Sequence, residues 1–507
     1  MQLTIEQQRI LDFVGQQKDQ RVAHVLLHAY AGAGKSFILA EIAKRLSGTG
    51  IYLAFNDAIV KDIQKKLPKH FTAMTTHKLA LQQLPKDVST RVRKSLMQDK
   101  GRIQIPMVTA TIPGFDGPNG MSLAGFAMRT IRQFCGSADD RMSTKHVPMP
   151  LPRRIHADEI LHGANAIWDA MLQFRLPITH DFYFKAWTLM GAPIPYDHRL
   201  IDEAQDTNPA VLSLLFKQKR GVSWWAGDPY QSIYSWRGAV DALTHVGKRK
   251  NTHADYLTRS FRFGDAPAHL ATKLLETLGE KRPVQGTGET SVHLVPGESR
   301  DPMRFVSHAK AMSVRSFAWL AFSNVNLLDV AMNCIDHDLS FHIVGQAKDE
   351  KSLIYAAMNL KAGKPDAKGP LSAYRQWSEL EEEADHYPGG DAAHLLSLYR
   401  HPGFGAILDG LNRGTASEAD AQVVLSTAHR AKGREWDLVV IDRDMDAAPD
   451  APTRSQTKKK RRFFVDADGL HFDNREDVHL RYVAFTRARK RLLVACPVLY
   501  EWWQKTA

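Results

Sequence analysis

The stretch AYAGAGKS at residues 29–36 follows the apolar run VAHVLL at 22–27 and leads into the helical pattern SFILAEIAKRL at 36–46. A strand, a glycine-rich loop and a helix in this order are typical of a phosphate-binding loop, because the free N–H groups at a helix N-terminus attract anions. Ala29 stands at the first glycine of the common GxxxxGK(S/T) pattern. The stretch predicts a nucleotide site in an α/β fold, with an ordinary glycine-rich turn as the alternative.

The residue types of this loop suit phosphate binding. Small residues allow backbone N–H groups to approach phosphate oxygens closely, and the loop has four of them in a row: Ala31, Gly32, Ala33 and Gly34. The Lys35 ammonium would reach the β- and γ-phosphates, and the Ser36 hydroxyl would hold Mg²⁺. We therefore expect a nucleotide with its magnesium ion as the ligand.

Composition sets broad limits on the class of protein. The chain has 507 residues, of which 44% are hydrophobic and 24% charged, and this is typical of a globular protein with two to four domains. No apolar run approaches the roughly 18 residues of a membrane span, and the N-terminus lacks a secretory pattern. Three widely spaced cysteines disfavour a zinc site or disulfides, so we expect a reducing, cytoplasmic environment, nucleoid-associated if the source is bacterial.

The charge balance bears on partners. A net charge of +12 favours a polyanionic partner, because each phosphate neutralised by a basic side chain releases counterions. The alternative is a basic protein that binds no nucleic acid, since net charge alone does not identify a function. The run KKKRR at 458–462 predicts either a loop that grips duplex DNA or a solvated surface loop.

Short apolar runs alternate with helical patterns along the chain, which predicts parallel α/β lobes. The runs are VAHVLL, IYLAF, VSWWAGD, SFAWLAF, SFHIVG, DLVVIDR and RLLVACP. The Gly- and Pro-rich stretches at 112–125 and 146–156 indicate loops within a mostly helical insertion, and a polar, helix-rich stretch at about 347–420 indicates a second one. We expect a first lobe at 1–85 and 195–265 with its insertion at 86–194, and a second lobe at 266–346 and 421–507 with a reduced insertion at 347–420.

A second acidic motif accompanies the phosphate loop. In LIDEAQD at 200–206, Asp202 would hold Mg²⁺ and Glu203 would orient the attacking water as general base. The alternative is an acidic loop in which Asp206 caps the helical pattern TNPAVLSLL.

The stretch AGDPYQSIYSWRGA at 226–239 resembles the third motif of superfamily 1 helicases of the UvrD/Rep/PcrA type. Six further stretches are similar to that family's motifs in the same order: LTIEQQRIL at 3–11, IYLAFN at 51–56, TTHKLAL at 75–81, LTRSFRF at 257–263, LSTAHRAKGREWDLVVI at 425–441 and RYVAFTRARKRLLV at 481–494. The sequences AFN, SFRFG and HRAKGREW are most similar to those of the F-box DNA helicase branch, although we recognise no F-box here. The resemblance implies two RecA-like motor lobes, each interrupted by a mostly helical accessory insertion.

The resemblance also implies roles around bound ATP. Gln7 would read the adenine, and Phe261 would stack on it. Gln231 would sense the γ-phosphate, and Glu435 would contact the ribose or phosphate region. Arg262 and Arg487 would reach the γ-phosphate as arginine fingers from different halves of the chain, so ATP would hold the two lobes together until hydrolysis. Taken singly, Phe261 could instead be a core residue, Arg262 a surface ion pair and Arg487 part of an exposed basic helix.

The resemblance implies a track for single-stranded DNA. Its expected contacts are Phe55, Asn56, Thr76, His77, Tyr234, Trp236, Thr427 and His429. Stacked aromatic side chains hold bases without regard to sequence. The sequences QSIYSWRGA and YVAFTRA resemble those of the branch that moves 3′→5′, so we expect an ATP-dependent 3′→5′ helicase. We expect it to act as a monomer on single strands and on junctions between single-stranded and duplex DNA.

Two rival functions stay open. The first is a translocase that strips proteins from single strands, or the motor subunit of a nuclease or defence complex with an accessory protein partner, which unwinds weakly alone. The second is a small-molecule kinase or signalling NTPase, which has no use for the motif QSIYSWRGA and whose ATPase would ignore DNA.

Overall fold

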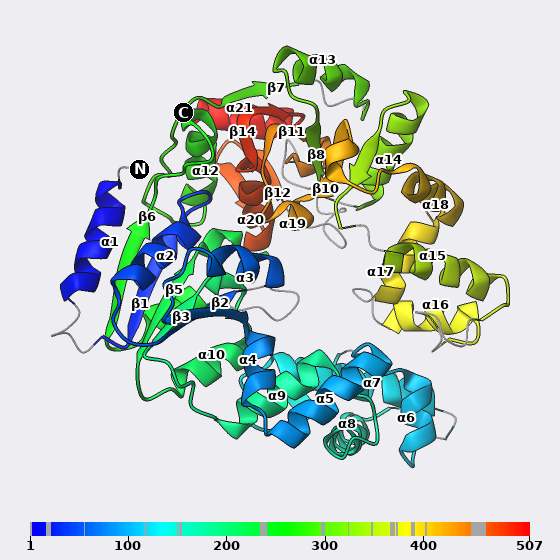
Figure 1. Cartoon of the computed structure of the whole chain (residues 1–507). Coiled ribbons are helices and arrows are strands. Elements are labelled where there is room, and N and C mark those ends of the chain that lie inside the picture. Colours follow the sequence, from blue (N-terminus) through cyan, green and yellow to red (C-terminus); the bar gives the residue numbers. More distant parts are fainter. Residues whose placement is uncertain are drawn as a thin grey trace.

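The computed structural model describes most of the chain in an α/β arrangement of two parallel sheets with helices around them (Figure 1). The described residues are 3–16, 22–54, 56–115, 117, 119–149, 151, 155–233, 241–295, 300–322, 324–345, 348–365, 371, 374–386, 391–400, 403–447 and 463–506. The predicted fold class, two RecA-like lobes with parallel sheets, is confirmed.

The first sheet has the strand order β3-β2-β4-β5-β1-β6, and every pair in it is parallel. Its strands are β1 (His24–Ala29), β2 (Gly50–Ala54), β3 (Phe71–Thr75), β4 (His198–Ile201), β5 (Val222–Gly227) and β6 (Thr252–Leu257). β1 lies between β5 and β6, with Leu26 opposite Trp225 and Ala254. The phosphate loop therefore emerges from the interior of the sheet, among the other strand ends.

Both faces of this sheet are covered by helices, which explains why its strands are short apolar runs. Trp224 and Trp225 of β5 are both buried and pack in different hydrophobic clusters, because successive residues of a strand point to opposite faces. The helices of the first lobe are α1 (Ile5–Gln16), α2 (Lys35–Arg45), α3 (Asp57–Gln64), α10 (Pro209–Phe216) and α11 (Ala242–Gly247).

The second sheet has the order β7-β14-β11-β8-β10-β9, and its pairs are also parallel. Its strands are β7 (Ser291–Leu294), β8 (Phe317–Ala321), β9 (Phe341–Ile343), β10 (Val423–Thr427), β11 (Trp436–Ile441) and β14 (Ala488–Val494). Its helices are α12 (Asp265–Glu276), α13 (Met303–Ala311), α14 (Asn324–Asp336), α19 (Ala428–Ala431), α20 (Arg475–Phe485) and α21 (Pro497–Lys505). An antiparallel hairpin, β12 (Phe463–Asp466) with β13 (Gly469–Phe472), precedes α20. The predicted basic run 458–462 lies outside the described residues.

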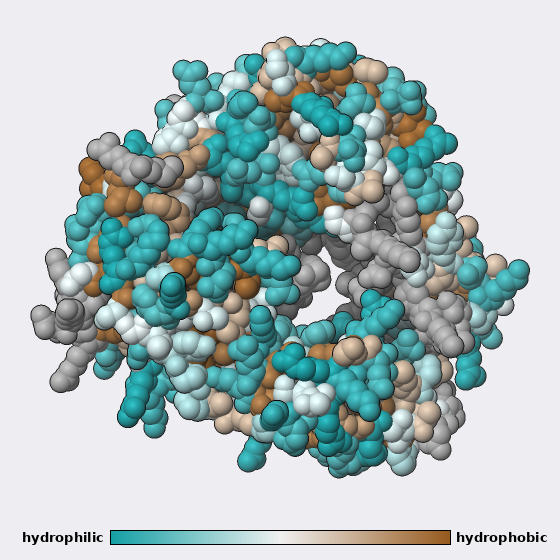
Figure 2. All heavy atoms as spheres, in the orientation of Figure 1, coloured by the Kyte–Doolittle hydropathy of each residue, from teal (hydrophilic) through white to brown (hydrophobic). Residues whose placement is uncertain are grey.

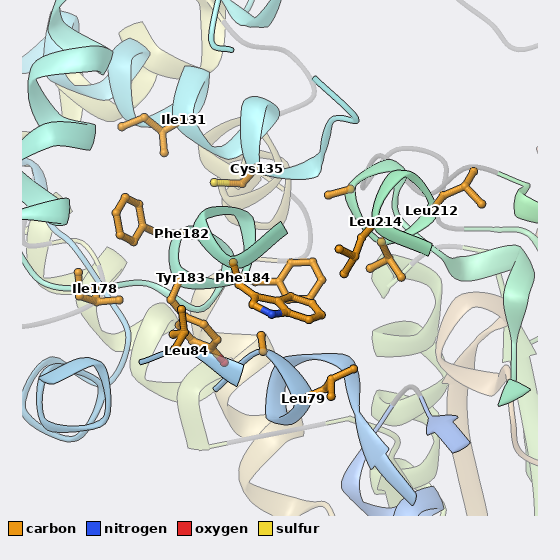
Figure 3. Close-up of a cluster of buried hydrophobic side chains, with 14 of the residues drawn as sticks. Leu79, Leu84, Ile131, Cys135, Ile178, Phe182, Tyr183, Phe184, Leu212 and Leu214 are labelled. Carbon is orange, nitrogen blue, oxygen red and sulfur yellow. The ribbon is translucent and has the colours of Figure 1, made fainter. Parts of the chain in front are cut away.

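A helical segment connects β3 to β4. It comprises α4 (Thr76–Gln83), α5 (Lys86–Asp99), α6 (Ile105–Thr111), α7 (Gly120–Gly136), α8 (Ala157–Leu172) and α9 (His180–Met190). Its core is continuous with that of the first lobe, since Leu79 of α4, Phe182 and Phe184 of α9 and Leu214 of α10 belong to one buried cluster (Figure 3). The helical segment is therefore packed firmly onto the first sheet.

A second helical segment connects β9 to β10 and comprises α15 (Lys348–Lys361), α16 (Trp377–His386), α17 (Asp391–Arg400) and α18 (Phe404–Arg413). It meets the first helical segment where Nη1 of Arg129 on α7 lies 3.2 Å from Oε1 of Glu383 on α16. Figure 2 shows an opening through the middle of the molecule, between the lobes and these helical segments. Among the described helices, none is both long and apolar enough to cross a membrane.

Candidate nucleotide site and nucleic-acid track

The phosphate loop is held against the segment that follows β6. Gly32 and Gly34 have φ angles of 75° and 82°, which favour glycine. A Cβ added to Gly32 would lie 2.5 Å from Oγ of Ser260 and 2.7 Å from Cβ of Arg262. The carbonyl of Gly32 accepts a hydrogen bond from the Phe261 N–H at 2.9 Å. The close approach of the two segments therefore requires glycine at position 32.

Ser36 and Asp202 come together beside the loop. The Ser36 hydroxyl donates to Oδ2 of Asp202 at 2.8 Å, and the Tyr52 hydroxyl donates to the same oxygen at 2.5 Å. Burial raises the pKa of Asp202, and the neighbouring Glu203 carboxylate acts in the same direction. A hydroxyl and a buried carboxylate that lacks a full counter-charge fit a magnesium ion, whose charge would favour the ionised form.

Phosphate oxygens and water would complete the shell of such an ion. No group of three or more His, Cys, Asp or Glu residues suited to a metal occurs within the described ranges. Magnesium bound by one or two protein oxygens, with phosphate oxygens and water completing its shell, is the usual arrangement at nucleotide sites.

Glu203 lies between positive charges. Its Oε1 is 3.8 Å from Nζ of Lys35, and its Oε2 accepts a hydrogen bond from Nε2 of Gln205 at 2.5 Å. Burial alone would raise its pKa, but the positive charges of Lys35 and Lys432 outweigh burial and, with Gln205, lower the pKa of Glu203 to about 2. Glu203 is therefore ionised at neutral pH and able to orient a water molecule.

Arg262 and Arg487 converge on this pocket from the two lobes. Arg487 is fully buried, and its Nη2 lies 3.4 Å from Oε1 of Gln231. Arg262 donates from Nε to Oε2 of Glu435 at 2.6 Å. Burial lowers the pKa of Arg487, and the positive charge of Arg262 lowers it further. The alternative that placed Arg487 on an exposed helix is wrong, because the residue is buried between α20 and β14.

A buried hydrogen-bond chain joins the lobes next to the arginines. Asp228 follows β5, and its Oδ2 accepts from Nε2 of Gln231 at 2.8 Å and from the hydroxyl of Tyr482 at 2.9 Å. The Tyr482 hydroxyl also accepts the N–H of Ala31 in the phosphate loop at 3.0 Å. Burial raises the pKa of Asp228. A tyrosine of α20 therefore contacts the phosphate loop directly.

Lys432 is a site residue that the sequence analysis missed. Its Nζ donates to Oδ2 of Asp206 at 2.5 Å and to the carbonyl of Gln231 at 2.6 Å. The alternative role of Asp206 as a helix cap is wrong, because Asn208 caps α10 by accepting the Val211 N–H at 2.9 Å. The position of Lys432 in the stretch HRAKGREW was its only signal in the sequence.

The candidates for binding the base lie around Gly34. A Cβ on Gly34 would lie 3.8 Å from Nε2 of Gln7 and 4.0 Å from Cδ2 of Phe261. Gln7 is buried, and its Oε1 accepts the N–H of Thr4 at 3.0 Å. Phe261 is 45% exposed, so it is not a core residue. Its ring is therefore free to stack on a planar ligand.

The described candidates for the DNA track follow the carboxyl ends of three parallel strands, where ligands bind in open α/β sheets. Asn56 follows β2 and caps α3 through the Ile59 N–H at 2.9 Å, and Thr427 ends β10 and caps α19. Thr76 and His77 begin α4 directly after β3. His429 lies on α19, with Nε2 4.0 Å from Oε1 of Glu476. The other three candidates, Phe55, Tyr234 and Trp236, lie outside the described residues.

His77 also has a structural environment. Its ring centroid is 4.8 Å from that of Phe184 and 6.1 Å from that of Tyr183, both on α9. Burial lowers the pKa of His77. The residue therefore joins the strand end of β3 to the first helical segment, in addition to its expected contact with DNA.

Comparison with known proteins agrees with this arrangement. Residues 188–248 match the UvrD/REP helicase N-terminal domain, and residues 392–497 match the UvrD-like helicase C-terminal domain. Segments in both halves of the chain are thus similar to UvrD-like helicase domains, which confirms the resemblance stated from its motifs.

Two curated proteins are similar to most of this chain. F-box DNA helicase 1 of Gallus gallus is 27% identical over 98% of this chain and 49% of its own length. F-box DNA helicase protein 1 of Schizosaccharomyces pombe (strain 972 / ATCC 24843) is 26% identical over 92% of this chain and 55% of its own length. The chain spans about half the length of these curated relatives.

Proposed function

We propose that this chain is an ATP-dependent DNA helicase that moves 3′→5′ along single-stranded DNA. The observation that carries the proposal is the convergence of Arg262 and Arg487, from the two halves of the chain, on the pocket of Lys35 and Glu203. The names of the two relatives support DNA as the nucleic acid. The 3′→5′ direction rests on the resemblance of the third and sixth motifs alone.

The residues of the pocket have distinct tasks in ATP hydrolysis. Lys35 binds the β- and γ-phosphates, while Gln7 and Phe261 hold the adenine. Ser36 and Asp202 hold Mg²⁺, which neutralises phosphate charge. The ionised Glu203 orients the attacking water, because a carboxylate with a pKa of about 2 accepts hydrogen bonds well but is a weak proton acceptor.

The arginines connect hydrolysis to movement. Charge that develops on the transferred phosphoryl group is stabilised by Arg262 and Arg487, and arginines in this role are worth about 10³–10⁵ in rate. Gln231 contacts Arg487, and Glu435 contacts Arg262, so both arginines have alternative partners when no phosphate is present. The lobes close when phosphate replaces these partners and open after hydrolysis, and Asn56, Thr76, His77, Thr427 and His429 contact the strand.

We propose domain limits that correspond to two motor lobes, each with an insertion. Residues 1–85 and 195–265 form the ATP-binding lobe with its insertion at 86–194, and residues 266–346 and 421–507 form the second lobe with its insertion at 347–420. A translocase or motor subunit with weak intrinsic unwinding is the second candidate. It is favoured by the small size of the second helical segment, for which α15 to α18 are the described helices.

The test is the ATPase rate with and without single-stranded DNA, for the wild type and Lys35→Ala. We expect strong stimulation by DNA in the wild type and no turnover in the variant. Equal wild-type rates with and without DNA would remove the motor function. Strand displacement on 3′-tailed and 5′-tailed duplexes tests the direction of movement. Activity on the 5′-tailed substrate alone would contradict the proposed 3′→5′ direction.

A further inference from the structure

One hydroxyl of the second lobe contacts two groups of the first lobe beside the nucleotide pocket. Tyr482 lies on α20 and is fully buried. Its hydroxyl accepts the Ala31 N–H of the phosphate loop at 3.0 Å and donates to Oδ2 of Asp228 at 2.9 Å. The single proton of this hydroxyl and one of its lone pairs are therefore both used across the junction between the lobes.

The contact with Asp228 extends to residues that are expected to act on the γ-phosphate and on water. Oδ2 of Asp228 also accepts from Nε2 of Gln231 at 2.8 Å. The Asp228 N–H donates to Oε1 of Gln205 at 3.0 Å. Nε2 of Gln205 in turn donates to Oε2 of Glu203 at 2.5 Å. The Tyr482 hydroxyl is thus connected, through Asp228, to the expected phosphate sensor and to the carboxylate expected to orient water.

The position and protonation of the Tyr482 side chain are well defined. Its ring packs in a buried cluster with Tyr30, Ala31 and Phe263. Burial and the neighbouring Asp228 carboxylate raise the pKa of Tyr482, so the hydroxyl keeps its proton at neutral pH. The hydroxyl reaches both of its partners only while α20 lies against the first lobe, because Ala31 and Asp228 belong to that lobe.

We propose that Tyr482 is a positioning residue for ATP hydrolysis, whose hydroxyl sets the phosphate loop and Asp228 in the arrangement that phosphoryl transfer requires. This inference rests on the proposed function. Lys35 and the loop bind ATP from the first lobe, so loss of the hydroxyl leaves ATP binding largely intact. Without the hydroxyl, the Ala31 N–H loses its partner and Asp228 loses one donor. Misplacement of catalytic groups by about 1 Å lowers a rate by as much as about 100-fold.

The test compares Tyr482→Phe with Tyr230→Phe in the full chain. Both substitutions keep the ring and remove a hydroxyl that donates to a carboxylate of the other lobe at 2.9 Å, since Tyr230 donates to Oε2 of Glu280. The two ring centroids are 6.3 Å apart. Tyr230 is therefore a matched control, whose hydroxyl contacts Glu280 rather than the phosphate loop or Asp228.

The measurements separate positioning from binding and from stability. They are kcat and KM of the oligo-dT-stimulated ATPase, the affinities for ADP and for ADP with aluminium fluoride, and the melting temperature. Aluminium fluoride stands in for the transferred phosphoryl group, so a contact that matters in the transition state affects its complex more than the complex with ADP.

We expect Tyr482→Phe to lower kcat by about 10- to 100-fold and to weaken the complex with ADP and aluminium fluoride by a similar factor. KM for ATP and the affinity for ADP should change by less than about threefold, and the melting temperature by a few degrees. Tyr230→Phe should keep kcat within about twofold of wild type.

A second variant tests the same chain from its other end. Asp228→Asn should also lower kcat, because it removes the charge that the Tyr482 hydroxyl and Gln231 contact. The double variant Tyr482→Phe/Asp228→Asn should lose less than the product of the two single losses, since residues that act as a unit are not additive.

Four results would overturn the proposal. They are a kcat of Tyr482→Phe within about twofold of wild type, an equal fall in kcat for Tyr230→Phe, an equal weakening of the complexes with and without aluminium fluoride, and multiplicative losses in the double variant. A wild-type kcat for Asp228→Asn would overturn it as well, whether or not Tyr482→Phe folds. Failure of the proposed helicase function gives a different result, because the wild-type ATPase would then not respond to oligo-dT at all.

Discussion

Nη2 of Arg487 lies 3.4 Å from Oε1 of Gln231, although the two residues are 256 positions apart in the chain. Gln231 follows the β5 strand of the first sheet, and Arg487 precedes the β14 strand of the second. Because Gln231 also donates to Asp228, which accepts from Tyr482, this contact is part of a buried chain across the lobes. A small relative movement of the lobes therefore alters several candidate catalytic residues together.

Replacement of Arg487 should abolish turnover while leaving nucleotide binding largely intact. We expect Arg487→Lys to lower the DNA-stimulated kcat by about 10³-fold or more, because a lysine lacks the forked guanidinium that contacts phosphoryl oxygens. Steady-state ATPase and binding of a fluorescent ATP analogue measure the two effects. Lys490→Gln is the control, since Lys490 is exposed on β14 and pairs with Asp437. A variant that keeps most of its kcat contradicts the role of Arg487.

Removal of the Lys432 ammonium should lower the free energy of unfolding, because Lys432 contacts residues of the other lobe. The variant Lys432→Met leaves Asp206 and the Gln231 carbonyl without this donor, and loss of one partner of a buried ion pair typically costs about 3–5 kcal/mol. Denaturant unfolding measures the loss. Lys432→Arg keeps the charge and should recover part of the stability. Equal stability of Lys432→Met and wild type would show that the contact does not stabilise the nucleotide-free protein.

Asp206 should make stability depend on pH. Burial raises the pKa of Asp206 from 3.8 to about 6, so its protonated form is favoured in the folded state. The stabilisation is complete below pH 3.8 and is lost as pH rises through 6, and the change amounts to about 3 kcal/mol at 1.36 kcal/mol for each pKa unit.

The pH effect is measured as the difference in unfolding free energy between wild type and Asp206→Asn. That difference should move against the wild type by about 2 kcal/mol between pH 4 and pH 6, out of about 3 kcal/mol for the whole titration. Glu203 acts at lower pH, because its pKa is lowered to about 2 and its contribution is lost only as pH falls from 4.5 toward that value. A difference that is constant from pH 4 to pH 7 would exclude the shift at Asp206.

A methyl group at position 32 should damage the phosphate loop more than backbone strain alone. Gly32→Ala combines a φ of 75° with contacts of 2.5 Å to Ser260 and 2.7 Å to Arg262, so we expect a loss of nucleotide affinity of at least about tenfold. Gly279→Ala is matched to it, because Gly279 has a φ of 88° and nothing within 4 Å of an added Cβ. Equal melting temperatures and equal nucleotide affinities for the two variants would contradict the packing argument.

The parts of the fold that could be predicted are those with local sequence signals. The phosphate loop, the LIDEAQD motif and most apolar runs of the two sheets are contiguous, and their order along the chain sufficed for the fold class. The predicted pairing of distant motifs around one nucleotide came from family resemblance.

Contacts between distant residues could not be predicted from the residues themselves. Lys432 and Asp206 are 226 positions apart, and Tyr482 and Asp228 are 254 apart, and neither pair has a spacing or composition that marks it. Buried polar partners of this kind are selected by three-dimensional packing, so single lysines and tyrosines within a motif give no sign of their contacts. The same reason explains why Asn208 rather than Asp206 caps α10.

The ion pair of Arg129 and Glu383 between the helical segments should be more sensitive to salt than the ion pair of Lys432 and Asp206 between the lobes. Its side chains are 22% and 30% exposed, and a partly exposed ion pair of this kind contributes at most about 1 kcal/mol and weakens with salt. The ion pair of Lys432 and Asp206, with side chains 8% and 5% exposed, is shielded from salt. Raising the ionic strength should therefore weaken the contact of Arg129 with Glu383 more than that of Lys432 with Asp206.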